Sequence, residues 1–186
     1  MTKYILHGRD TSYINPDNDG FFREITLGTK GKTTILLNYF SRKDDEVEKC
    51  AEQDEQRFLQ HSENKNLAFE IARPENLAEQ LGRSDVMYMR GGETKKLLDA
   101  LSLTKNIEKL FKNKIIAGSS AGAYALGAHY WENGTDEMGN GLWVLEFKVL
   151  CHYTPERNDR IEKLLKYGKE MPLLILPDYK WVVLFK

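Results

Sequence analysis

The chain has 186 residues, of which 41% are hydrophobic and 11% aromatic, so it is long enough to bury the core of one globular domain and too long for a disulfide-stapled miniprotein. Its 27 Lys and Arg residues almost balance its 28 Asp and Glu residues, which gives no general attraction to nucleic acid or to anionic membranes. We therefore expect a single domain over residues 1–186, with neither nucleic acid nor a membrane as partner.

Short apolar runs alternate with longer amphipathic segments, a pattern typical of an α/β protein with a mainly parallel sheet. The runs expected as strands are residues 4–7, 33–40, 67–72, 85–89, 114–117, 142–152, 173–176 and 181–185. The segments expected as helices are residues 21–27, 44–62, a short one from Pro74, 95–111, 123–128 and 155–167. The last two strands are expected to form a hairpin around residues 177–180. This order predicts a three-layer αβα, flavodoxin-like architecture.

The cysteines and the N-terminal segment indicate in which cellular compartment the protein is expected. Cys50 and Cys151 are far apart and belong to no CxxC pair, which favours a reducing compartment. The N-terminal segment lacks the pattern of a signal peptide, and no stretch approaches the roughly 18 apolar residues of a membrane span. We expect a cytoplasmic protein.

The strongest chemical signal is a G-x-S-x-G pattern, Gly-Ser-Ser-Ala-Gly at residues 118–122, between an expected strand and an expected helix. Small residues on both sides let the chain turn so sharply that Ser120 stands clear of the sheet edge. The backbone N–H of Ala121 would then point at the space above the serine hydroxyl. The alternative interpretation is a glycine-rich turn without chemistry.

A serine hydroxyl needs a base to become a good nucleophile. Of the four histidines, His152 lies at the end of an expected strand, on the edge expected for Ser120, and His129 is the reserve candidate. The base in turn needs a carboxylate to hold its tautomer. Asp136 and Glu137 lie in a polar loop that could reach this edge, and the sequence does not choose between them.

Two consecutive glycines, Gly91 and Gly92, follow another expected buried strand. Glycine lets the chain turn a backbone N–H toward the site, and together with the Ala121 N–H this would form an oxyanion hole. No H-E-x-x-H pattern or Cys/His cluster indicates a metal ion, and we expect no cofactor.

Residues 85–98, 114–123 and 149–160 resemble, in order and spacing, the peptidase E and cyanophycinase family of serine peptidases, whose fold is similar to that of class I glutamine amidotransferases. The resemblance covers roughly residues 67–186. Members of this family cleave aspartyl dipeptides or β-aspartyl-arginine polymers without a metal. The roles that the resemblance implies are nucleophile for Ser120, general base for His152, third member of the triad for Asp136 or Glu137, and oxyanion donors for Gly92 and Ala121.

The sequence also departs from the family pattern. Arg90 and Glu93 flank the two glycines, where the family has a small residue and an Asn or Asp, and their charges could alter the preference for substrate charge. Dipeptidase members carry an arginine after the histidine that binds the aspartyl carboxylate of the substrate. Arg157 and Arg160 lie in this region, at a shorter separation from the histidine. We expect both, with Gly91, to contact the substrate.

These observations predict a serine hydrolase that cleaves short peptides, with an aspartyl dipeptide as the expected substrate, through an acyl-enzyme on Ser120. A homodimer is compatible with the sequence. Two alternatives remain open, a glutamine-amidotransferase-like acyl transferase and a non-catalytic binding module of the same fold.

Overall fold

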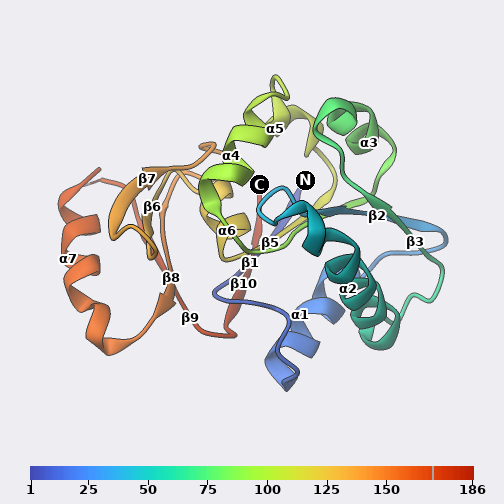
Figure 1. Ribbon diagram of the computed structural model, residues 1–186, viewed down its shortest axis with the longest axis horizontal. Coiled ribbons are helices and arrows are strands. Elements are labelled where there is room, and N and C mark those ends of the chain that lie inside the picture. The colour runs from blue at the N-terminus through green and yellow to red at the C-terminus, as the bar shows by residue number, and fades with distance from the viewer. Residues whose placement is uncertain (169) are drawn as a thin grey trace.

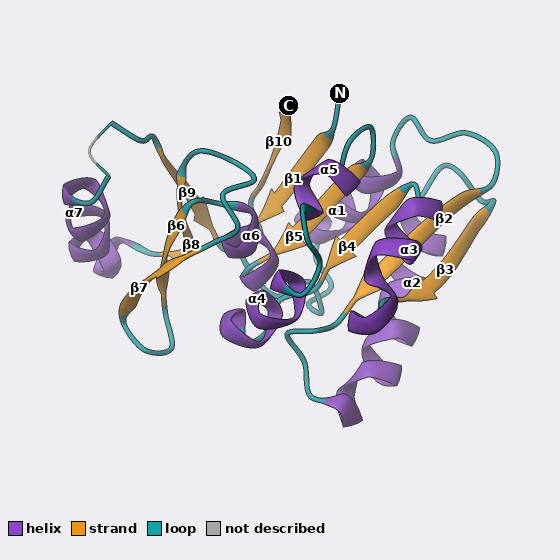
Figure 2. Ribbon diagram, turned by 90° about the horizontal axis from the view of Figure 1, so that it is seen from above, coloured by secondary structure: helices purple, strands orange, loops and turns teal. Residues whose placement is uncertain are grey.

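Six strands form the larger of two sheets, in the order β10-β1-β5-β4-β2-β3. The structure, a computed structural model, describes residues 1–168 and 170–186. The strands of this sheet are β1 (Lys3–His7), β2 (Thr33–Asn38), β3 (Leu67–Ile71), β4 (Val86–Met89), β5 (Ile115–Ser119) and β10 (Trp181–Phe185). The first five are parallel, and β10 runs antiparallel to β1. The carboxyl ends of the parallel strands therefore meet at one edge (Figure 2), where open α/β sheets place their sites.

Helices cover both faces of this sheet because the side chains of its strands alternate between two apolar cores. In β1, Ile5 packs into the core formed with α1 and α2, whereas Tyr4 and Leu6 pack into the core formed with α3 to α6. Figure 1 shows α1 and α2 below the sheet and α3, α4 and α5 above it. This arrangement confirms the predicted three layers. The helices are α1 (Pro16–Thr26), α2 (Val47–His61), α3 (Leu77–Arg83), α4 (Thr94–Ser102), α5 (Ile107–Leu110) and α6 (Ala121–Leu126).

A second, four-stranded sheet lies beside the first, on the left in Figure 1, in the order β7-β6-β8-β9. Its elements are β6 (His129–Glu132), β7 (Glu137–Asn140), β8 (Lys148–Tyr153), β9 (Leu173–Pro177) and the covering helix α7 (Asn158–Lys166). Leu164 of α7 packs against Trp131 and Leu150 of this sheet. Val149 and Cys151 of β8 face the other way and join the core of the larger sheet.

Three expectations from the sequence are wrong in detail. The helix expected over 95–111 is divided into α4 and α5, because Asn106 adopts a left-handed conformation with φ 54°. The strand expected over 142–152 begins only at Lys148, and β6 and β7 were not expected at all. The strands expected as a C-terminal hairpin separate, because β9 pairs with β8 and β10 pairs with β1.

The remaining described segments are turns and loops. Three short 3-10 turns, Asp44–Glu46, Pro74–Asn76 and Pro155–Arg157, lead into α2, α3 and α7. Among the described residues no helix combines the length and the apolar character that crossing a bilayer requires.

Candidate active site

Ser120 stands on the sharp turn between β5 and α6. Its backbone has φ 47° and ψ −104°, a conformation that L-residues rarely adopt and that stores strain. The Ser120 N–H donates to the carbonyl oxygen of His7 at 2.9 Å, which ties the turn to the end of β1. The side chain is partly exposed while Ser119 before it is buried. This is the strained strand-to-helix turn that the G-x-S-x-G pattern predicts.

The flanking glycines are required because backbone packs against them. A Cβ atom on Gly118 would lie 2.5 Å from the carbonyl carbon of Gly122. A Cβ on Gly122 would lie 2.7 Å from the carbonyl oxygen of Met89 in the neighbouring strand β4. Real Cβ atoms essentially never approach other atoms so closely, so neither position accepts a side chain without movement of the main chain. Close packing thus fixes the position of Ser120.

His152 lies on β8, at an irregularity in its pairing with β9 between Cys151 and Tyr153. The residue has φ 55°, and its N–H donates to the carbonyl oxygen of Gly8 at 3.0 Å instead of continuing the ladder. Such a bulge redirects a side chain. The His152 Nε2 atom lies 2.7 Å from Ser120 Oγ, so the predicted nucleophile and base are within hydrogen-bond distance. His129, the reserve candidate, instead bonds to Asn140 Oδ1 through Nδ1 at 2.7 Å.

The carboxylate beside His152 is Asp178, a residue of the expected hairpin turn around residues 177–180. Its Oδ1 atom lies 3.3 Å from His152 Nδ1. Asp178 follows β9, and β9 runs parallel to β8, so both residues reach the same end of the small sheet. Asp178 lies outside the stretch between Ser120 and His152 from which the candidate acids were drawn, and no local pattern marks it, because only the pairing of β9 with β8 brings it to the histidine.

Asp136 and Glu137 do not occupy this position, and the prediction that one of them contacts the histidine is wrong in this structure. Asp136 sits in the turn between β6 and β7, where it accepts a hydrogen bond from Trp131 Nε1 at 2.9 Å and pairs with Arg160 at 3.0 Å. Glu137 is an exposed residue at the start of β7. The hairpin that carries them turns their side chains toward solvent and α7.

The surroundings of His152 favour its neutral form. Burial is the largest cause and lowers the pKa of the ring, since a charged imidazolium loses hydration there. The carboxylate of Asp178 opposes this by raising the pKa, and the positive charges of Arg157 and Arg9 lower it again. A neutral ring whose Nδ1–H faces Asp178 leaves Nε2 free to accept the proton of Ser120.

Gly91 and Ala121 are backbone neighbours of Ser120. Gly91 packs against it, since a Cβ on Gly91 would lie 3.0 Å from the Cβ of Ser120. The Gly91 N–H itself donates to Ser119 Oγ at 2.9 Å, so this group is already engaged, and the expected contact of Gly91 with substrate stays a prediction. Within residues 1–168 and 170–186, the N–H groups of Gly92 and Ala121 have no hydrogen-bond acceptor. They are the two donors expected for an oxyanion hole.

Arg90 and Glu93 do not act as charged groups over the serine. Arg90 is only 3% exposed and points away from the sheet edge into an ion pair with Asp54 of α2 at 3.2 Å. Burial raises the pKa of Asp54 to about 6, although Arg90 and the hydroxyl of Tyr39 stabilise its charged form. Glu93 is exposed and occupies the N-cap position of α4, where its side chain makes no capping hydrogen bond. The expected influence of Arg90 on substrate charge is therefore wrong.

Arg157 and Arg160 approach the site from the start of α7. The Nη1 atom of Arg157 donates to the carbonyl oxygen of His152 at 2.6 Å and to Asn133 Oδ1 at 3.2 Å. Arg160 bonds to the same Asn133 oxygen and to Asp136, one step farther from the histidine. Of these two arginines, Arg157 is the one that donates a hydrogen bond directly to the backbone of His152.

Cys151 lies next to His152 but is not part of the candidate site. It is fully buried, and burial raises the pKa of its thiol, so it stays a protonated core residue.

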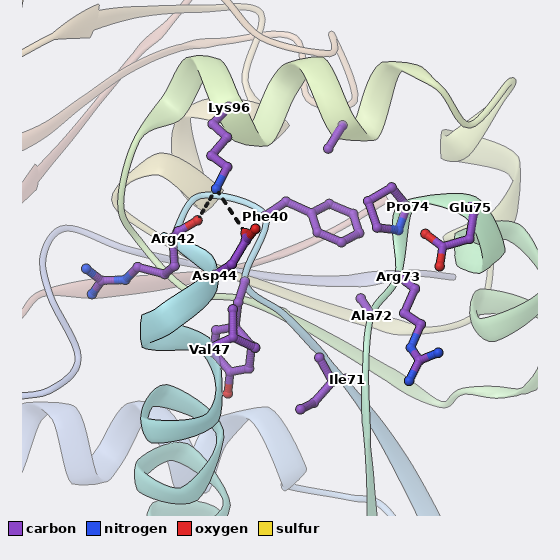
Figure 3. A pocket seen from close by; sticks show the side chains of 12 residues that line it. Phe40, Arg42, Asp44, Val47, Ile71, Ala72, Arg73, Pro74, Glu75 and Lys96 are labelled. Carbon is purple, nitrogen blue, oxygen red and sulfur yellow. Dashed lines mark hydrogen bonds and ion pairs between the residues drawn. The ribbon is translucent and has the colours of Figure 1, made fainter.

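A cavity of about 310 Å³ lies apart from the candidate site, at the carboxyl ends of β2 and β3 (Figure 3), where Phe40 faces Pro74 and Lys96 reaches toward the Arg42 carbonyl. It contains neither Ser120 nor His152. The described residues hold no group of three His, Cys, Asp or Glu side chains placed to bind a metal ion.

The chain is similar to known peptidases in sequence and in fold. The model of peptidase family S51 matches residues 15–185. A peptidase structure from an acI-B1 actinobacterium superposes with a TM-score of 0.71 at 16% identity and covers 99% of this chain and 83% of its own. A protein from Listeria monocytogenes EGD-e assigned as a peptidase E superposes with a TM-score of 0.69 at 19% identity, over 99% of this chain and 94% of its own. No curated protein gives a significant match. The solved structures show that the fold is similar to that of peptidase E proteins.

Proposed function

The chain belongs to peptidase family S51, and on that premise we propose that it is a serine peptidase that uses Ser120, His152 and Asp178 as a catalytic triad. The observation that carries this proposal is the 2.7 Å separation of Ser120 Oγ and His152 Nε2 on a strained strand-to-helix turn. A strained serine with a histidine at hydrogen-bond distance has the geometry of an activated nucleophile.

In the proposed mechanism, Ser120 Oγ attacks the carbonyl carbon of the scissile bond while its proton passes to His152 Nε2. The negative charge that develops on the carbonyl oxygen is stabilised by the N–H groups of Gly92 and Ala121. His152 then gives the proton to the leaving amine, and the C–N bond breaks to leave an acyl-enzyme. A water molecule, deprotonated by His152, attacks the ester, and the returning proton restores the serine hydroxyl. Asp178 stabilises the imidazolium in both steps.

We propose short peptides with an aspartyl residue as substrates. Arg157 supports this choice, because a guanidinium recognises a carboxylate by two parallel hydrogen bonds. Both contacts of Arg157 with Asn133 and His152 use Nη1, so within the described residues Nη2 has no partner and can meet a substrate carboxylate.

The test compares the purified protein with its Ser120→Ala variant on an aspartyl dipeptide such as Asp-Leu. We expect the wild-type protein to release free aspartate and the variant to lose this activity, with unchanged circular dichroism and thermal midpoint. Equal turnover by both proteins would contradict the proposal. Release of ammonia from glutamine, with no cleavage of the dipeptide, would instead favour an amidotransferase-like enzyme.

A further inference from the structure

The carboxylate of Asp178 is held by very few groups. Asp178 lies in the turn between β9 and β10, where the Lys180 N–H donates to the Pro177 carbonyl at 3.1 Å. Its Oδ1 atom is buried and, among the described residues, meets no hydrogen-bond donor closer than the Nδ1 atom of His152 at 3.3 Å. Its Oδ2 atom accepts a hydrogen bond from Nη1 of Arg9. A short side chain on a turn needs a second anchor to keep one oxygen aimed at the histidine.

Arg9 is itself held in place from two sides. Its guanidinium lies over the rings of Tyr13 and Tyr179, 5.4 Å from each ring centroid. The two rings meet edge-on, with centroids 6.1 Å apart. Stacking between aromatic faces restricts an arginine and favours its charged form. The ion pair with Asp178 also raises the pKa of Arg9, so the cation persists throughout the pH range of the reaction.

The backbone next to Arg9 joins the two segments that carry the base and the acid. The carbonyl oxygen of Gly8 accepts the N–H of His152 at 3.0 Å, and the N–H of Gly8 donates to the Lys180 carbonyl at 2.9 Å. Gly8 has no room for a side chain, because a Cβ atom there would collide with the carbonyl oxygen of Pro177. Residues 8 and 9 are therefore packed between β8 and the β9–β10 turn.

We propose that Arg9 is a positioning residue that holds the Asp178 carboxylate against His152 and sets kcat through Asp178. Apart from this role, the charge of Arg9 has a direct effect on His152, whose pKa it lowers. The proposal rests on the proposed triad. Arg9 fixes one carboxylate oxygen so that the other faces Nδ1, which selects the tautomer in which Nε2 accepts the proton of Ser120. The two tyrosine rings keep the guanidinium from leaving the carboxylate.

The test is a double-mutant cycle on the full chain, with hydrolysis of Asp-Leu as the readout. Arg9→Gln is expected to lower kcat on the order of 100-fold, the cost of a small misplacement of a catalytic group, while KM stays within about twofold. In an Asp178→Asn background the same substitution is expected to change kcat by less than about twofold, because the carboxylate on which Arg9 acts is already gone. Arg9→Lys, which keeps the charge without the planar fork, is expected to recover part of the loss.

Lys180→Gln is the matched control, since it removes a positive charge from the same turn. The Lys180 ammonium pairs with Asp17 at 2.8 Å, and the substitution should leave kcat and KM unchanged. A rise in KM with unchanged kcat for Arg9→Gln would overturn the proposal and make Arg9 a substrate-binding group. Equal effects in the wild-type and Asp178→Asn backgrounds would overturn it as well. If the wild-type protein cleaves no dipeptide, the proposed substrate fails, and the same cycle is read as the rate at which a fluorophosphonate labels Ser120. A rate that Arg9→Gln leaves unchanged would then overturn the role of Arg9, and a loss that disappears in the Asp178→Asn background would support it.

Discussion

At the scale of single residues, the proposed triad depends on which carboxylate faces His152. Removing the charge of Asp178 leaves the ring free to adopt the wrong tautomer, with its proton on Nε2. Asp178→Asn is therefore expected to lower kcat by up to about 10,000-fold, by analogy with the same change in other triads. Steady-state hydrolysis of the dipeptide measures this loss.

Asp136→Asn provides the matched comparison, because both variants replace a carboxylate by its amide. Asp136 contacts Trp131 and Arg160 and does not contact His152 within the described residues. We expect only a small change in kcat for this variant. A larger loss for Asp136→Asn than for Asp178→Asn would show that the triad acid is wrongly assigned.

The pH dependence of kcat/KM also belongs to the residue scale. His152 must be neutral to accept a proton, so activity rises as pH increases through the pKa of the ring in the free enzyme. Burial lowers that pKa, and the acid limb should have its midpoint below the usual value of about 6.5. Because the charge of Asp178 raises the pKa, Asp178→Asn should move the limb still lower. A wild-type midpoint above the usual histidine value would contradict this electrostatic description.

At the scale of elements, the turn between β5 and α6 depends on the absence of side chains at its glycines. Gly118→Ala would place a Cβ against the backbone of Gly122 and is expected to destabilise the protein by about 1–3 kcal/mol. Gly82→Ala is the control, because Gly82 lies in helix α3 with open space around it and its replacement should stabilise by about 0.4–1 kcal/mol. Urea unfolding measures both free energies. A neutral Gly118→Ala would mean that this turn does not constrain Ser120.

Local sequence patterns predict elements well where periodicity and small residues decide the structure. The parallel strands and the turn at Ser120 belong to this group, because apolar alternation and the G-x-S-x-G spacing are local signals. The division of the predicted helix 95–111 is not visible in its periodicity, since it results from the left-handed conformation of Asn106. Strands β6 and β7 are short and lie around a polar turn, so they too carry a weak signal.

The sequence does not reveal which strands pair with one another over long distances in the chain. The strand pattern on both sides of residues 177–180 fits a hairpin, and only the tertiary structure shows that β9 joins β8 while β10 joins β1. Asp178 reaches the site through this exchange between sheets, and it meets Arg9, which follows β1 and is 169 residues away from Asp178 in the chain. Both residues lie outside the stretch between Ser120 and His152, and no local pattern links them to it.

At the scale of the whole molecule, the site lies where the two sheets meet. The six-stranded sheet contributes Ser120 at the end of β5, and the four-stranded sheet contributes His152 from β8. Asp178 lies on the connection from one sheet to the other, and Gly8 at the end of β1 bonds to the segments that carry the base and the acid. The relative placement of the two sheets thus determines the Ser120–His152 distance. The near-neutral charge of the chain provides no general attraction to a charged substrate, which is why we propose a local group, Arg157, for substrate selection.

The measurement that tests the central claim most directly is labelling of the native protein with a serine-directed fluorophosphonate, followed by mass spectrometry of its peptides. An activated serine reacts and an ordinary surface serine does not. We expect a single adduct on Ser120, which is absent in Ser120→Ala and forms much more slowly in His152→Ala. A folded wild-type protein that takes up no label, or that carries the label on another serine, would contradict the claim that Ser120 is a nucleophile activated by His152.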